Sequence, residues 1–228
     1  MTIRAADSTI STVNAAEIDR FSRLAAQWWD PEGPMWPLHK LNALRAPYIA
    51  ETIERQCGGA HTRDHGSSGP LSGLRILDIG CGAGLLSESM AALGAAVTGV
   101  DPAANNIAIA RAHANSVGLD IDYRQGAVED LPDGQFDVVL NMEVVEHVAS
   151  LPIFMDHCCR LTRPGGLQFV ATINRNLLSL LVAIIGAEYV LRWLPRGTHQ
   201  WRKFVTPAEM KALLARGGLD IVEGRGVA

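Results

Sequence analysis

The chain has 228 residues, of which 48% are hydrophobic and 19% are charged, and its formal net charge is −4. This length and composition suit a globular α/β-sized domain and exclude a disordered chain. The slight acidity argues against a nucleic-acid partner bound by bulk charge. Four cysteines without disulfide or zinc-like spacing, and an N-terminus without an apolar signal core, favour a cytoplasmic location.

The first 60 residues are expected to form a helical cap. Asn14 followed by Glu17 resembles a capping box that opens a helix ending near Trp28. A loop, WWDPEGPMWPLHKLN, follows, and a second helix is expected over about 41–56. Trp28, Trp29 and Trp36 either form part of a lid that excludes water or pack in the ordinary way. The Gly/Ser-rich residues 61–73 are expected to be a loop.

A strand–helix alternation sets in at Leu74. The strand-like runs are RILDIG, AVTGVD, IDYRQG, FDVVLN and LQFVAT, and the expected helices between them cover 85–93, 104–117 and 152–161. This order predicts an α/β fold with a doubly wound, mostly parallel sheet in a domain of residues 74–228. The segment GLDIVEGRGVA is expected to supply one more strand.

The stretch LDIGCGAGLLSESM carries glycines at alternate positions in the first strand-to-helix turn. Glycine permits positive φ there and lets a ligand approach the backbone, so Gly80 and Gly82 are candidate cofactor contacts. The dinucleotide fingerprint G-x-G-x-x-G is not met, because Leu85 and Ser87 occupy the positions where its third glycine would fall.

Two acidic residues accompany the glycines. Asp101 ends the second strand, where a carboxylate can accept hydrogen bonds from both ribose hydroxyls of an adenosine. Asp78 lies inside the first strand, where a carboxylate is costly unless it is hydrogen-bonded. The combination resembles class I S-adenosylmethionine-dependent methyltransferases. In that superfamily an acidic residue after the third strand lies near the adenine, which here implies Asp130 in AVEDLP.

Glu143, Glu146 and His147 follow the fourth strand at spacing i, i+3, i+4, in a turn or a short helix. On a helix they would share one face and could bind a divalent cation or hold a general base. A phenol, with a pKa of about 10, attacks a methyl group well only as phenolate. A base such as His147, or a cation that lowers the phenol pKa, would supply that form. A polar helix start with no catalytic role is the alternative.

Several longer stretches narrow the resemblance. WWDPEGPMWPLHKLNALRAPYI, LDIGCGAGLLSESMA, NMEVVEHV, LTRPGGLQFVATINRN and GAEYVLRWLPRGTHQWRKFVTPAEM resemble the ubiquinone biosynthesis O-methyltransferase family over nearly all of the chain. The resemblance implies methylation of hydroxyl groups on polyprenylated phenol or catechol precursors, at two steps of ubiquinone synthesis. It also implies a cofactor site at Arg45, Gly80, Asp101 and Met142. The resemblance also implies that magnesium would bind at Glu143, Glu146 and His147. Family members are expected to close the sheet with a further strand, which this sequence is expected to lack.

The apolar segment after the fifth strand, within an insertion of residues 176–204, is long enough to approach the thickness of a bilayer core. Glu188 and Arg192 argue against a spanning helix. The tryptophans and basic residues near its end suit a headgroup layer, so residues 177–203 are expected to contact the inner membrane face peripherally. A lid helix without lipid contact is the alternative.

Three other functions fit parts of the pattern. The first is C-methylation of the quinone ring, and the second is a non-catalytic cofactor-binding subunit that docks at the membrane, alongside other quinone-biosynthesis proteins. The third is a dehydrogenase, which the missing fingerprint glycine disfavours.

Overall fold

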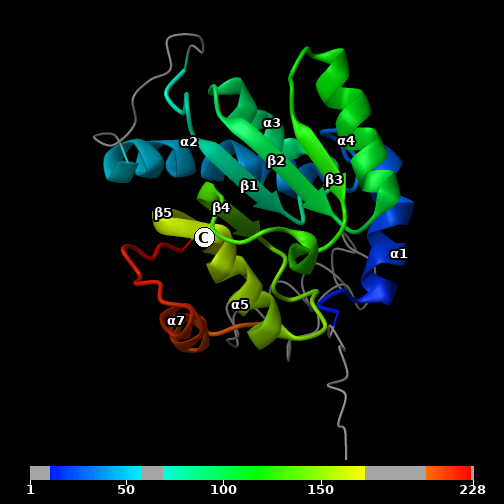
Figure 1. Cartoon of the computed structure of the whole chain (residues 1–228). Coiled ribbons are helices and arrows are strands. Elements are labelled where there is room, and N and C mark those ends of the chain that lie inside the picture. The colour runs from blue at the N-terminus through cyan, green and yellow to red at the C-terminus, as the bar shows by residue number, and fades with distance from the viewer. Residues whose placement is uncertain (1–10, 58–68, 173–203, 227–228) are drawn as a thin grey trace, which may run out of the picture.

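The computed structural model describes residues 11–57, 69–172 and 204–226. Its centre is a five-stranded sheet of order β3-β2-β1-β4-β5, in which every neighbouring pair is parallel (Figure 1). The strands are β1 (Arg75–Ile79), β2 (Ala96–Asp101), β3 (Asp122–Gln125), β4 (Phe136–Met142) and β5 (Thr162–Ala171). The strand order reverses between β1 and β4, which confirms the predicted doubly wound fold.

Helices cover both faces of this sheet (Figure 1). On one face α2 (Trp36–Cys57) and α3 (Leu85–Ala92) pack against β1 and β4, with α4 (Ala104–Ser116) beside β3. On the other face lie α5 (Leu151–Leu161) and α7 (Pro207–Arg216). The strands alternate between these layers: Ile76 and Val138 belong to the first core, whereas Leu77 and Val139 belong to the second. Burial on both faces explains the nearly continuous apolar runs of the central strands.

The N-terminal segment consists of α1 (Ala15–Leu24), the 3₁₀ helix η1 (Ala25–Gln27) and then α2. The second helix was expected from about residue 41, but α2 begins at Trp36. Pro37 is the second residue of the helix, where proline is tolerated because the first helical N–H groups need no partner within the helix. Ile49 and Ile53 of α2 are each 1% exposed in the same core as β1 and β4, so this helix is integral to the sheet layer.

The C-terminal segment differs from the expectation. Thr206 caps α7 through a capping box with Glu209, but residues 219–226 form no strand in the described part of the chain. The segment instead lies along α2, where Glu223 pairs with Arg55 at 2.8 Å and Arg225 lies over the ring of Tyr48. These contacts attach the segment to the helix layer.

The apolar insertion of residues 176–204 lies almost wholly outside the described residues. Among the helices that the structure does describe, none combines the length and the apolar character needed to cross a bilayer.

Candidate cofactor and active site

The polar residues that the sequence singled out gather at one edge of the sheet. The glycine loop of residues 80–84 follows β1, Asp101 ends β2, the 3₁₀ helix η2 (Val128–Asp130) follows β3, and Glu143 follows β4. These are the carboxyl ends of parallel strands, where open α/β sheets bind their ligands.

The glycine loop has the backbone that the sequence predicted. Gly80 and Gly82 have φ of 66° and 56°, a left-handed conformation that residues with a Cβ adopt only at a cost. A Cβ atom on Gly82 would lie 2.3 Å from Cη2 of Trp28, and one on Gly80 would lie 2.5 Å from Cγ2 of Val144. Both positions therefore require glycine for conformation and for space.

Asp101 is 7% exposed and holds the loop in place. Its Oδ2 accepts a hydrogen bond from the backbone N–H of Gly82 at 3.0 Å. Its Oδ1 accepts from the N–H of Ala103 at 2.8 Å and from Nδ2 of Asn106 at 3.2 Å. Burial raises the pKa of this carboxyl, and the three hydrogen bonds act in the opposite direction. A carboxylate has about four acceptor positions, so one remains for a ligand hydroxyl.

The charges of Asp78 and Arg45 interact near the glycine loop. Asp78 is 3% exposed and accepts a hydrogen bond from Oγ of Ser87 at 2.6 Å. Burial raises the pKa of Asp78 to about 6, against the opposing effects of Ser87 and Arg45. Burial also lowers the pKa of Arg45, although Asp78 and Glu143 attract its charge. Nη1 of Arg45 is buried, and no described residue accepts a hydrogen bond from it.

Glu143 has φ of 60°, which makes it the one non-glycine residue with positive φ in the described part of the chain. Such strained positions cost roughly 1–3 kcal/mol and cluster at functional sites. Desolvation, and then the charge of Glu146, raise the pKa of Glu143 to about 7, while Arg45 lowers it. A carboxyl group with this pKa can exchange a proton near neutral pH.

Glu146 and His147 do not join Glu143 on a helix face. Residues 145–147 form a turn, because the positive φ at Glu143 is incompatible with a right-handed helix. Oε1 of Glu146 accepts a hydrogen bond from Thr172 at 2.8 Å, and Nδ1 of His147 lies 3.1 Å from Oε2 of Glu17. Across the described ranges, no three His, Cys, Asp or Glu side chains are arranged to hold a metal ion. The three-residue magnesium set therefore does not fit the observed geometry.

The remaining sequence candidates occupy the rim of the site. Asp130 is exposed, and its Oδ2 accepts a hydrogen bond from the N–H of Ala127 at 3.0 Å, which closes the turn of η2. Met142 is the last residue of β4 and packs in part against the first core. Both lie at the carboxyl edge of the sheet, as the sequence predicted.

Residues 11–30, which we call the strap, are tied to several loops at this edge. Both the N–H and Oγ1 of Thr12 donate to the carboxylate of Glu129, at 2.9 and 2.7 Å. Further along the strap, Glu17 contacts His147, and Oγ of Ser22 accepts a hydrogen bond from Nδ2 of Asn105 at 2.7 Å. The strap thus runs past η2, the loop after β4 and the start of α4 before it reaches the glycine loop.

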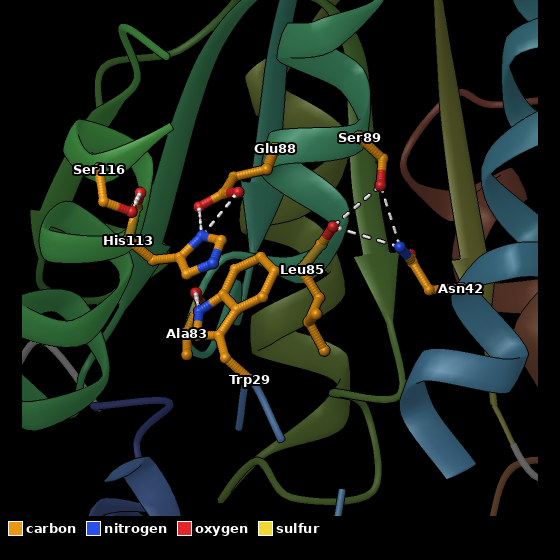
Figure 2. A network of polar contacts seen from close by, with 8 residues as sticks. All are labelled: Trp29, Asn42, Ala83, Leu85, Glu88, Ser89, His113 and Ser116. Carbon is orange, nitrogen blue, oxygen red and sulfur yellow. Dashed lines mark hydrogen bonds and ion pairs between the residues drawn. The ribbon is translucent and has the colours of Figure 1, made fainter. Parts of the chain in front are cut away.

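At the glycine loop the strap ends in two tryptophans. Figure 2 shows the Trp29 ring lying flat on the imidazole of His113, with centroids 3.4 Å apart and planes 5° from parallel. Nε1 of Trp29 donates to the carbonyl oxygen of Ala83 at 3.0 Å, and Nδ1 of His113 lies 2.8 Å from Oε1 of Glu88 (Figure 2). Beside this network Asn42 of α2 donates to the carbonyl of Leu85 and to Ser89, which ties α2 to α3 (Figure 2).

These strap contacts were not predicted as site residues. The paired tryptophans were the only signal, and they pointed equally to packing. Glu88 and His113 are single polar residues in helices, and no local pattern distinguishes them from surface positions.

Comparison with known proteins identifies the family. A family described as "Methyltransferase domain" matches residues 77–170. The ubiquinone biosynthesis O-methyltransferase of Brucella anthropi is 55% identical over 219 residues, which cover 95% of this chain and 87% of the relative. The protein of the same name from Chelativorans sp. is 53% identical, with 95% and 85% covered. The chain belongs to the ubiquinone biosynthesis O-methyltransferase family.

Solved structures agree on the fold of this family member. A magnesium protoporphyrin IX methyltransferase from Synechocystis PCC 6803 with bound S-adenosylhomocysteine (SAH) aligns with a TM-score of 0.62 at 19% identity. The alignment covers 92% of this chain and 87% of that one. The structure of the same enzyme with bound SAM gives the same TM-score at 18% identity, covering 92% and 84%. The fold is therefore that of a class I, S-adenosylmethionine-dependent methyltransferase.

Proposed function

We propose that this chain transfers a methyl group from S-adenosylmethionine to a hydroxyl oxygen of a polyprenylated phenol or catechol in ubiquinone biosynthesis. The 55% identity over 95% of the chain carries the proposal, because it extends well beyond the glycine loop that all class I methyltransferases share. The names of the relatives supply the reaction and the pathway.

The residues at the carboxyl edge fit the cofactor. The buried Nη1 of Arg45, which no described residue accepts from, suits the amino-acid carboxylate of S-adenosylmethionine. The remaining acceptor position of Asp101 suits a ribose hydroxyl, and the glycine loop lets the cofactor approach the backbone at Gly80 and Gly82. Met142 would contact the adenosine, and Asp78 would support Arg45 through its charge. Asp130 would lie near the adenine.

The substrate hydroxyl must lose its proton as the methyl group moves. The bound cofactor supplies an electrophilic methyl group on its sulfonium sulfur, so the protein has to align the oxygen and accept the proton. We assign the base to His147, whose Nδ1 is paired with Glu17, so that Nε2 would receive the phenol proton. The carboxylate of Glu17, 3.1 Å from Nδ1, would stabilise the imidazolium that forms. Glu143, whose pKa burial raises to about 7, and the neighbouring Glu146 are further candidates to take up a proton.

The described geometry does not support a magnesium site, and proton transfer to His147 does not require one. Glu143 and Glu146 interact through their charges, but His147 is paired with Glu17 and Glu146 with Thr172. A cation at the full set would require these contacts to rearrange.

The membrane contact proposed for residues 177–203 concerns a segment outside the described residues. Its support is the apolar sequence followed by tryptophans and basic residues, together with a substrate whose polyprenyl tail lies in lipid. Cosedimentation with anionic vesicles, with and without deletion of the segment, would test it. Association with other quinone-biosynthesis proteins would be tested on the same membranes.

One assay tests the proposed reaction. The protein is incubated with methyl-labelled S-adenosylmethionine and a short-tailed catechol quinol in detergent, with magnesium or with chelator, while calorimetry measures SAH binding. We expect labelled product in both conditions. Loss of product in chelator, restored by magnesium, would revive the metal set at Glu143, Glu146 and His147. SAH binding without any transfer would favour the non-catalytic alternative.

A further inference from the structure

Trp28 presents a buried hydrogen-bond donor beside the glycine loop. Its side chain is 8% exposed and packs among Ala25, Met35, Ala83 and Leu85. Nε1 is fully buried, and no described residue accepts a hydrogen bond from it. A buried donor without an acceptor costs about 1–3 kcal/mol, so such groups in native proteins call for a partner.

The neighbouring tryptophan is satisfied within the protein. Nε1 of Trp29 donates to the carbonyl of Ala83, and its ring stacks on His113, which is itself paired with Glu88 (Figure 2). The carbonyl oxygen of Trp28 lies 2.8 Å from Nε2 of His39. His39 of α2 therefore holds the carbonyl of Trp28, while the indole N–H of Trp28 has no acceptor among the described residues.

The position of the ring indicates which ligand would supply that acceptor. The six-membered ring of Trp28 lies over Gly82, whose N–H is bonded to the carboxylate of Asp101. A ribose hydroxyl that donates to Asp101 keeps lone pairs with which it can accept a second hydrogen bond. Trp28 and Asp101 would thus hold the same sugar from the two sides of the loop.

From this arrangement we propose that Trp28 is a cofactor-binding residue, whose indole N–H donates to a ribose hydroxyl oxygen of bound S-adenosylmethionine. This inference rests on the proposed function. The strap then contributes directly to cofactor binding through the indole of Trp28.

The test observes the indole directly in the intact protein. Tryptophan is labelled with ¹⁵N, and the five indole N–H signals are followed by NMR as SAH is added. The Trp28 signal is assigned with Trp28→Phe or, if that variant does not fold, by assigning the wild-type spectrum sequentially. We expect the Trp28 signal to shift with SAH and also with methylthioadenosine, which has the ribose but not the carboxylate.

The outcomes separate this inference from the proposed function. If SAH binds by calorimetry and leaves the Trp28 signal in place, the inference is wrong and the methyltransferase assignment stands. If SAH does not bind at all, the proposed methyltransferase function is wrong, and the inference about Trp28, which rests on it, is wrong with it. A shift with SAH but none with methylthioadenosine would also overturn the ribose contact.

A matched pair of variants gives a second test, because Trp28→Phe and Trp29→Phe each remove one indole N–H, from adjacent positions. We expect Trp28→Phe to weaken SAH binding about 3- to 10-fold, the usual range for one lost hydrogen bond. The SAH-induced rise in Tm should shrink in Trp28→Phe and persist in Trp29→Phe, whose lost bond is internal to the protein. If the SAH-induced rise in Tm shrinks equally in both variants, Trp28 contributes by packing and does not donate a hydrogen bond to the cofactor.

Discussion

Replacing Asp101 by asparagine tests the core of the site, because its carboxylate is shared between the glycine loop and the proposed ribose contact. Oδ1 accepts from the N–H of Ala103 and from Asn106, and Oδ2 accepts from the N–H of Gly82. Asparagine has one oxygen. If its NH₂ group replaces Oδ2, it faces the N–H of Gly82. If it replaces Oδ1, Asn106 can flip, but the N–H of Ala103 faces a donor.

Either orientation leaves one buried backbone N–H without an acceptor, which costs about 1–3 kcal/mol. Removing a buried charge offsets part of this cost, since burial already raises the pKa of Asp101. We therefore expect Asp101→Asn to lower the free energy of unfolding by about 1–2 kcal/mol, in the lower half of that range. For a chain of this size, that corresponds to a fall in Tm of about 2–8 °C.

Urea unfolding followed by circular dichroism would measure the stability, and calorimetry would measure SAH binding. The affinity for SAH should fall at least about tenfold, because the ribose loses a charged acceptor. Asp122→Asn is the matched control. Asp122 is exposed, and its side chain pairs with the exposed Arg124, so the stability and the SAH affinity should barely change. An Asp101→Asn protein with unchanged stability and unchanged SAH affinity would refute the reasoning.

Three further predictions concern the charged residues of the site. Burial raises the pKa of Glu143 in the folded protein to about 7, above its ordinary value of 4.5, so between these two values the folded state holds a proton that the unfolded state has released. The contribution of Glu143 to the free energy of unfolding therefore falls as pH rises from 5 to 8. Glu143→Gln should reduce this fall in the free energy of unfolding by about 2 kcal/mol, measured by urea unfolding. An equal fall in the wild type and the variant would contradict the conclusion that burial raises the pKa of Glu143. Arg45→Lys should weaken SAH binding at least about tenfold by calorimetry, because an ammonium group does not reproduce the fixed, planar donor geometry that directs Nη1 of Arg45; unchanged affinity would place the cofactor carboxylate elsewhere. His147→Ala should lower kcat about 10²-fold or more in the labelled-methyl assay with SAH affinity retained, whereas an unchanged kcat would exclude it as the base.

The sheet and the cofactor loop could be predicted because their signals are local. Both faces of β1 and β4 are buried, so the strands read as apolar runs, and the glycines mark the turn after β1. The family of the chain was also predictable from sequence, because its motifs extend beyond that loop.

The errors arose where tertiary context decides the backbone. Pro37 suggested a loop but lies in the first turn of α2, where its missing N–H has no consequence. The spacing of Glu143, Glu146 and His147 suggested a shared helix face, but a positive φ at Glu143 produces a turn. The apolar and charged residues of 219–226 suggested a strand, but the segment pairs with α2 through Glu223.

The strap could not be predicted from sequence for a different reason. Thr12 and Glu129 are 117 positions apart, and Glu17 and His147 are 130 apart, so nothing in either neighbourhood indicates the other. These contacts exist because the carboxyl ends of all the strands meet at one edge, where a single crossing segment can reach each loop.

The central claim is methylation at oxygen, and the position of the transferred carbon tests it most directly. The protein would be incubated with ¹³C-methyl S-adenosylmethionine and a short-tailed catechol quinol, and the product examined by NMR and mass spectrometry. We expect one labelled methyl group bound to a ring oxygen as a methyl ether. A labelled methyl group on a ring carbon, or unmodified quinol despite SAH binding, would contradict it.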